Sequence, residues 1–173
     1  MQTVSQGAQP PLPGLYWPEQ QGWYAGIARS EDGQSHWHLI LPDATPETDF
    51  VSIWGTYGQK IDGASSRHNG MANTEAMAAA GCPAARKVLV LRGGLHIPSQ
   101  AELQLLCATL HDKFNQRDWY WSSTQGSAHS AFVQGFDVGN SLWGFKDGES
   151  RVRAVRGLAL QPFSTSTVPG ILA

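Results

Sequence analysis

Residues 119–124, Trp119-Tyr120-Trp121-Ser122-Ser123-Thr124, set the architecture of this chain. Two indole rings flank a phenol ring in one short segment, which gives a core a large apolar anchor. The three hydroxyls that follow can bond backbone groups in a tight turn. We therefore expect a short strand at residues 119–123, and we expect Trp121, Ser122 and Ser123 to hold the fold rather than to contact a ligand.

A capped helix is expected before this strand. Ser99 followed three residues on by Glu102 is the capping-box pattern of a helix start. Apolar residues then recur at helical spacing, at Leu103, Leu106, Leu110 and Phe114. Together these signals predict a helix over residues 100–115.

Turn residues divide most of the remaining sequence into short strands. Asp32-Gly33 lies between two strand-like runs, at residues 23–28 and 36–41, and this is a hairpin signal. After the serine-rich turn, strand patterns recur at residues 131–136, 141–145 and 151–155.

Two further elements are expected between residues 73 and 91. Asn73 suits the N-cap of a helix from Thr74 to Ala80, with Gly81 just beyond its end. The run Val88-Leu89-Val90-Leu91 fits a buried strand, although a short apolar run also fits a helical turn.

The composition is that of one largely β domain with flanking segments, rather than that of a helical bundle. The chain has 173 residues, with 7 Trp, 19 Gly and 10 Pro. Charged residues make up 15% of the sequence, well below the usual share of about 25%. This mixture favours a rigid, loop-rich fold. We expect a flexible arm at residues 1–14, a single domain at residues 15–160 and a loose tail at residues 161–173.

Several classes of protein are excluded by charge and hydropathy. The net charge of −2 shows no basic excess, so a nucleic-acid partner is not expected. No apolar run approaches the roughly 18 residues of a membrane span, and the first residues lack the pattern of a signal peptide. Cys82 and Cys107 are too few for a disulfide framework, and free, buried thiols are favoured over a bridge between them.

Three motifs stand in a fixed order along residues 95–158. Ile97-Pro98-Ser99 with Glu102-Leu103 comes first, residues 119–124 follow, and Arg151-Val152-Arg153-Ala154-Val155-Arg156 ends the series. This order resembles the Lcl C-terminal domain family, in particular its phage and prophage members. The resemblance implies an α+β, C-type-lectin-like fold, akin to that of formylglycine-generating enzymes, with short twisted antiparallel strands, one or two helices and long loops. Relatives often carry cysteine where Ala154 stands, so no disulfide is carried over from them.

Catalytic and metal-binding chemistry is not expected. His36 and His38 share a strand face, but no third ligand is evident nearby, so a solvent-facing or hydrogen-bonded pair is favoured over a metal site. The acidic residues Asp43, Glu47 and Asp49 lack EF-hand spacing and are better explained as a solvated loop. We predict no enzymatic activity, no catalytic residue, no cofactor and no bound metal; an oxidase of the formylglycine-generating type ranks last.

A binding surface is the remaining candidate. The segment between residues 125 and 146 combines aromatic and small polar side chains with few charges, as antibody binding sites do. The predicted ligand-binding residues are Gln125, Ser127, His129, Gln134, Asp137, Asn140, Trp143 and Phe145. Trp143 and Phe145 share one strand face. They anchor a partner if that face is outward, and they belong to the core if it is inward.

The function predicted from these observations is recognition without catalysis. The resemblance implies a module of a phage or prophage tail fibre or baseplate that binds a bacterial surface receptor. The alternative is a structural virion protein, such as a baseplate, fibre-attachment or decoration piece. The expected partners are a bacterial cell-surface protein or glycan, or other virion proteins, and self-association into a homo-oligomer is left open. The expected location is the virion, after synthesis in the host cytoplasm.

Overall fold

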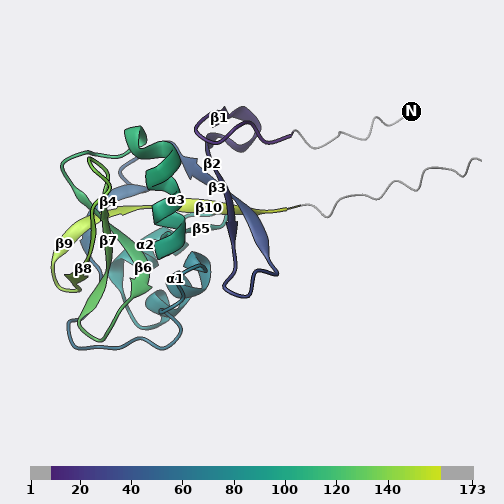
Figure 1. The fold of residues 1–173 in the computed structure, drawn as a ribbon. Helices are drawn as coiled ribbons and strands as arrows, with labels where there is room; N and C mark the ends of the chain where they lie inside the picture. Colours follow the sequence, from purple (N-terminus) through teal and green to yellow (C-terminus); the bar gives the residue numbers. More distant parts are fainter. Residues whose placement is uncertain (1–8, 161–173) are drawn as a thin grey trace, which may run out of the picture.

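Two five-stranded sheets and three α-helices make up the fold in the computed structural model, which describes residues 9–160 (Figure 1). This arrangement agrees with the expected α+β class. The resemblance implied one or two helices, and the third is α2, which lies where a strand was expected. Neighbouring strands pair antiparallel, except that β6 and β9 pair in parallel.

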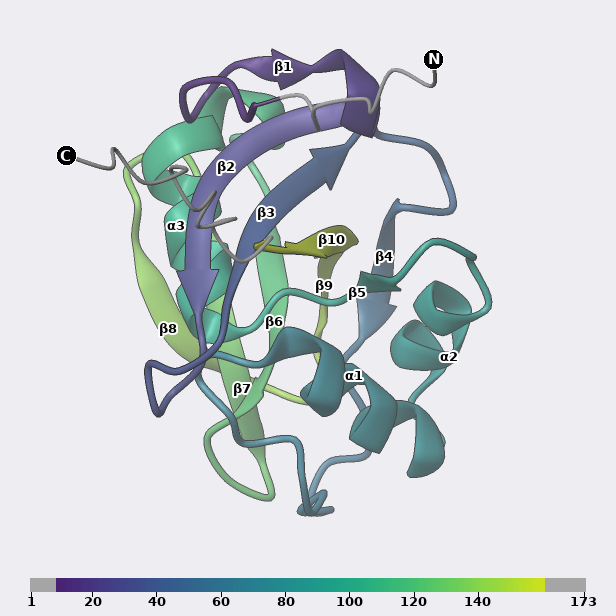
Figure 2. The same ribbon diagram turned by 90° about the vertical axis from the view of Figure 1, so that its right-hand side faces the viewer.

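The first sheet is built around the predicted hairpin. Its strands, in spatial order, are β1 (Tyr16–Trp17), β2 (Gly22–Arg29), β3 (His36–Pro42), β10 (Val155–Ala159) and β5 (Leu95–His96). Gly33 in the connecting turn has a φ of 70°, which suits glycine. In Figure 2, β2 and β3 run side by side with α3 behind them. The predicted strands at residues 23–28 and 36–41 are therefore confirmed.

The second sheet contains the Trp119–Thr124 stretch at its centre. Its strands, in spatial order, are β4 (Asp49–Ile53), β9 (Glu149–Arg153), β6 (Trp119–Gln125), β7 (Ser130–Gly135) and β8 (Ser141–Phe145). Helices α1 and α2 contribute to the same apolar cluster as Trp121, while α3 shares a second cluster with Tyr120 and both sheets. The second sheet is therefore buried on both faces over its central strands.

Helix α3 (Gln100–Leu110) starts as the sequence predicts. The Ser99 hydroxyl accepts a hydrogen bond from the Glu102 backbone N–H at 3.3 Å, and the Glu102 carboxylate accepts one from the Ser99 N–H at 2.8 Å. The helix ends five residues earlier than expected, and a 3-10 turn, His111–Lys113, follows it. Phe114 then stacks on Phe136 with 3.8 Å between ring centroids.

Helix α1 (Gly70–Ala79) begins one turn earlier than predicted. Its N-cap is Asn69, whose side chain accepts a hydrogen bond from the Ala72 N–H at 3.0 Å. Asn73 is instead fully buried, where it accepts from the Ser66 N–H and donates to the Ser66 carbonyl. An asparagine does cap this helix, as expected, but the residue is Asn69. Asn73 cannot serve as the cap because hydrogen bonds to the Ser66 backbone occupy its side chain.

The predicted strand at residues 88–91 is wrong. Helix α2 (Pro83–Leu89) covers the first two residues of this run, with Pro83 at a first-turn position where proline is favoured. Val88 is buried against the core, and Val90 beyond the helix end is 76% exposed. The helical turn therefore places Val88 in the core and Val90 in solvent.

Most of the two flanking segments lies outside the described residues, which leave out residues 1–8 and 161–173. Within the described part of the expected arm, the Gly14 N–H donates to the Tyr24 carbonyl at 2.8 Å. Residues 9 and 160 both lie on the side of the molecule opposite β8 and β9 (Figure 1).

A buried ion pair joins α3 to the first sheet. His96 Nε2 lies 3.1 Å from Glu102 Oε1, and both side chains are at most 3% exposed. The Trp37 indole N–H also donates to Glu102 Oε1, at 2.9 Å. Burial alone would lower the pKa of His96, but the adjacent carboxylate outweighs burial and raises it. Burial alone would raise the pKa of Glu102, but His96 and the neighbouring donors lower it.

This pair predicts a stability maximum in mildly acidic solution. Glu102 stabilises the fold above its ordinary pKa of 4.5, and that contribution is lost as pH falls through the lowered value. His96 stabilises it fully below its ordinary pKa of 6.5, and that contribution is lost as pH rises through the raised value. Urea unfolding from pH 3 to pH 8 should show both declines. An equally steep alkaline decline in a His96→Gln variant would contradict this assignment.

Candidate functional site

Strand β8 is one of the two edge strands of the second sheet and carries two exposed aromatic side chains. Trp143 is 44% exposed and Phe145 is 66% exposed. They lie on the same face of the strand, because side chains alternate along it. The structure thus settles the alternative left open by the sequence: these rings belong to the surface and not to the core.

Two further rings extend this surface. Tyr57, which is 50% exposed, lies with its ring centroid 4.7 Å from that of His129 and 5.9 Å from that of Phe145. Tyr57 comes from the loop after β4, and His129 comes from the turn between β6 and β7. We call Tyr57, His129, Trp143 and Phe145 the aromatic patch.

The aromatic patch rests on a rigid base. The Trp143 ring packs edge-on against the Phe132 ring with 5.6 Å between centroids. It also covers Gly126, where a Cβ atom would come within 2.7 Å of the indole ring. Only glycine leaves room for the ring at that position. Trp143 is therefore held in orientation while almost half of it stays open to solvent.

Buried polar side chains hold the neighbouring loop in place. The Gln125 side chain accepts from the Ile61 N–H at 3.0 Å and donates to the Ile61 carbonyl and to the Ser65 hydroxyl. The Lys146 ammonium donates to the Gln59 carbonyl at 2.7 Å and to Gln125 Oε1 at 2.8 Å. Burial lowers the pKa of Lys146 to about 8. Gln125 and Lys146 thus fix the loop that carries Tyr57.

The predicted ligand-binding residues fall into distinct groups. His129, Trp143 and Phe145 come together in the aromatic patch. Asp137 and Asn140 are exposed in the turn between β7 and β8, at the opposite end of β8 from Phe145.

The other three predicted residues have structural contacts. Gln125 and Gln134 are at most 4% exposed, so neither side chain is part of the surface. The Gln134 side chain donates to the carbonyls of Gly135 and Asn140. The Ser127 hydroxyl accepts from the N–H groups of His129 and Ser130, which closes the turn between β6 and β7.

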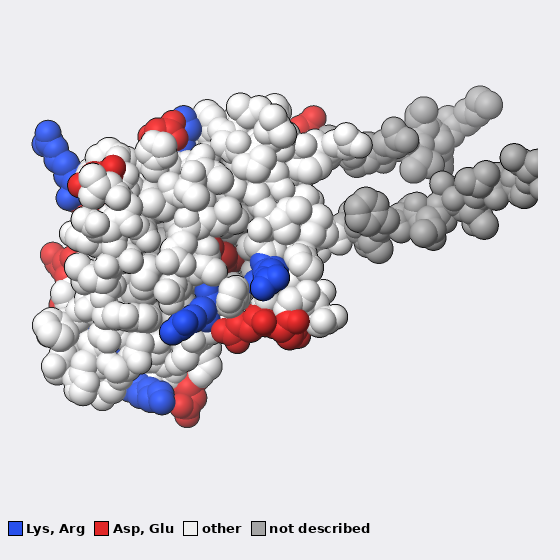
Figure 3. Space-filling view, in the orientation of Figure 1, with Lys and Arg blue, Asp and Glu red and all other residues white. Residues whose placement is uncertain are grey.

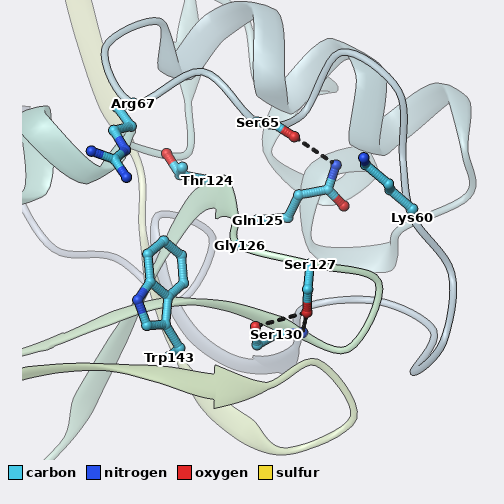
Figure 4. Close-up of a pocket in the computed structure, with 9 residues that line it drawn as sticks. All are labelled: Lys60, Ser65, Arg67, Thr124, Gln125, Gly126, Ser127, Ser130 and Trp143. Atoms are coloured by element: carbon cyan, nitrogen blue, oxygen red, sulfur yellow. Dashed lines mark hydrogen bonds between the residues drawn. The ribbon is translucent and has the colours of Figure 1, made fainter.

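A pocket of about 570 Å³ opens beside Trp143 (Figure 4). We call it the basic pocket, and its lining residues are Lys60, Ser65, Arg67, Thr124, Gln125, Gly126, Ser127, Ser130 and Trp143. Two of these side chains are cationic and none is acidic. Figure 4 shows them arranged around one opening, with residues from the 60–67 loop facing residues from β6, β7 and β8.

Tyr57, Lys60 and Arg67 were missed by the sequence analysis. They lie in a glycine-rich stretch for which the sequence predicts no helix or strand. The only available signal was the presence of aromatic and basic residues in a glycine-rich segment, and nothing in that segment indicates which strand it contacts.

The residues considered for metal binding have other contacts. The ring nitrogen Nδ1 of His38 lies 2.9 Å from the Tyr24 hydroxyl, while His36, the first residue of β3, is exposed. Asp49 forms ion pairs with Arg151 and Arg153 at 3.0 and 3.1 Å. Within residues 9–160 no group of three His, Cys, Asp or Glu side chains is placed to hold a metal ion.

The two cysteines of the chain are free thiols. Burial raises the pKa of both Cys82 and Cys107, which keeps them protonated and weakly nucleophilic.

Charged side chains are sparse and scattered over the face shown in Figure 3, which is mostly uncharged.

Comparisons with known proteins place the chain by fold alone. No family model matches the sequence, and no curated protein matches it. Among solved structures, the chain is similar to a fimbrial protein from Bacteroides ovatus ATCC 8483, with a TM-score of 0.51 and 14% identity. The match covers 75% of this chain but 37% of that chain. Over the described part of the sequence, no helix has the length and apolar character needed to cross a bilayer.

Proposed function

We propose that this chain is a non-catalytic recognition module with a C-type-lectin-like fold, related to the Lcl C-terminal domain family. In this proposal it belongs to a phage or prophage tail fibre or baseplate and binds a receptor on the bacterial surface. The aromatic patch on β8 is the observation that carries the proposal. The likeness to a fimbrial protein concerns the fold and adds nothing on the partner.

The physical properties of the aromatic patch suit binding. Rigid aromatic side chains contribute large contact area at a small cost in conformational entropy. The Trp143 ring is already oriented by its packing on Phe132 and Gly126, so the side chain loses little conformational entropy on association. The aromatic patch contains no Asp, Glu, Lys or Arg side chain, so little charge must be desolvated on association.

The motif residues make structural contacts within this chain. The Pro98 carbonyl accepts hydrogen bonds from the backbone N–H and the hydroxyl of Ser123, at 2.8 and 3.2 Å. The Thr124 hydroxyl accepts from the Gln100 N–H at 2.9 Å. The two motifs therefore hold α3 against β6, which leaves β8 and its neighbouring loops as the part that can vary with the partner.

A binding screen tests the proposal against its alternative. The labelled protein is incubated with a panel of bacterial cells and, in parallel, with purified virion parts. Saturable binding to cells supports receptor recognition. Binding to virion parts alone supports the structural-virion alternative and overturns the proposal.

The Trp143→Ala variant should bind the cells recognised in this screen at least about 30-fold more weakly, because an exposed aromatic anchor contributes about 2 kcal/mol or more. Its far-UV spectrum and melting temperature should change little. Val138→Ala is the matched control, since Val138 is 73% exposed but lies in the turn between β7 and β8. Unchanged affinity in the Trp143 variant would remove the aromatic patch as the binding surface.

A further inference from the structure

The lining of the basic pocket includes two cationic side chains and no acidic one. Lys60 and Arg67 are exposed, and neither forms an ion pair with another side chain of residues 9–160. The Arg67 backbone is fixed, because its N–H donates to Glu31 Oε1 at 2.9 Å and its carbonyl accepts from the Ala101 N–H at 2.8 Å. The loop therefore presents two cationic side chains at one opening, with the Glu31 carboxylate bound to its backbone.

A flat apolar wall stands opposite these cations. The Trp143 indole lines the pocket, and Gly126 beneath it fixes the ring. Figure 4 shows the indole on one side of the opening and the 60–67 loop on the other. An indole face suits the apolar C–H face of a sugar ring, and the cations suit a carboxylate on the same ring.

Small polar groups complete the lining. The Ser65 hydroxyl accepts a hydrogen bond from Gln125 Nε2 at 3.1 Å, so its own hydrogen is free to donate. Ser127 and Ser130 share a hydrogen bond at 3.0 Å on the opposite side. Pockets that hold small ligands measure roughly 300–1,000 Å³, and the volume of about 570 Å³ falls within that range.

We infer that the basic pocket binds an acidic saccharide, a sugar that carries a carboxylate, with its ring on Trp143 and its carboxylate on Arg67 and Lys60. This inference rests on the proposed recognition function and names the class of receptor. Calcium is not required, because the charge of the ligand is met by side chains of the pocket. A simple phosphate ligand would use the cations but not the indole, so the ring contact separates the two chemistries.

Calorimetric titration with defined probes tests the inference. The probes are trigalacturonate and a trimer of α2,8-linked sialic acid as acidic saccharides, maltotriose as the neutral saccharide, and inorganic phosphate. We expect at least one acidic trimer to bind more tightly than maltotriose and phosphate, with an affinity that falls as sodium chloride is raised. Equal or weaker binding of both acidic trimers relative to maltotriose overturns the inference.

Variants assign the site. Arg67→Gln should weaken binding of the acidic trimer about tenfold or more, because a hydrogen bond to a charged group is lost. Lys60→Gln should have a similar effect. Trp143→Ala should lower the affinity for acidic and neutral saccharides alike. Arg92→Gln is the matched control, because Arg92 is an exposed cation that does not line the pocket. Unchanged affinity in both pocket variants also overturns the inference, even if the trimer binds.

The cell-binding screen separates failure of this inference from failure of the proposed function. If cells bind through Trp143 but no acidic trimer is preferred, the receptor is of another class and the recognition function stands. If an acidic trimer binds and no cell does, the pocket is correctly assigned and the recognition function fails.

Discussion

Replacing Glu102 with leucine is expected to lower the free energy of unfolding by about 3–5 kcal/mol, because the substitution removes one partner of a buried ion pair. The carboxylate accepts hydrogen bonds from the Trp37 indole and the Ser99 N–H, and it lies 3.1 Å from His96 Nε2. Leucine leaves the buried His96 ring and Ser99 N–H, and the half-buried Trp37 indole, without this acceptor. It also breaks the capping box of α3.

Urea unfolding at pH 6 measures this loss. Glu75→Leu in α1 is the matched control, since Glu75 is exposed and has no recorded ion pair within residues 9–160. A loss below about 1 kcal/mol for the Glu102 variant would show that neither the pair nor the cap stabilises the fold as described.

Trp121→Ala is expected to cost about 3–5 kcal/mol, the usual loss for a large aromatic side chain removed from a core. Trp121 is 2% exposed, and its indole N–H donates to the Ser52 carbonyl at 3.0 Å. Its ring also packs against Gly144, where a Cβ atom would lie 3.1 Å from it. The variant leaves a cavity at the centre of the second sheet and removes the donor to the Ser52 carbonyl in the edge strand β4.

Trp143→Ala is the matched control for this prediction, because it makes the same chemical change two strands away on the exposed edge. Thermal or urea unfolding should show a much larger loss for Trp121 than for Trp143. Equal losses would mean that the second sheet has no division between a buried anchor strand and an exposed recognition strand.

Local signals in the sequence predicted most elements of the fold. The capping box of α3 and the Asp32-Gly33 hairpin depend on residues within a few positions of one another, so they could be identified without tertiary structure. The prediction of a strand at residues 88–91 was wrong, because a run of four apolar residues fits one helical turn as well as a short buried strand. Asn73 failed as a cap because a contact with Ser66 uses its side chain.

The candidate site was predicted only where it lies within one segment. Trp143, Phe145 and His129 could be proposed from composition and alternation, since β7 and β8 are neighbours in sequence. Gln125 and Gln134 fit the same composition, but their amides satisfy buried backbone groups. The contributions of Tyr57, Lys60 and Arg67 depend on the packing of a distant loop, which periodicity does not encode.

Fluorine NMR of protein labelled with 5-fluorotryptophan tests most directly whether Trp143 is the contact with the partner. The chain has seven tryptophans, and the Trp143 resonance is assigned by its loss in Trp143→Phe. On addition of the receptor material identified by the cell-binding screen, the Trp143 resonance should shift or broaden while those of the buried Trp54 and Trp121 stay unchanged. An unchanged Trp143 resonance in a sample that binds the receptor would contradict the assignment of β8 as the recognition surface.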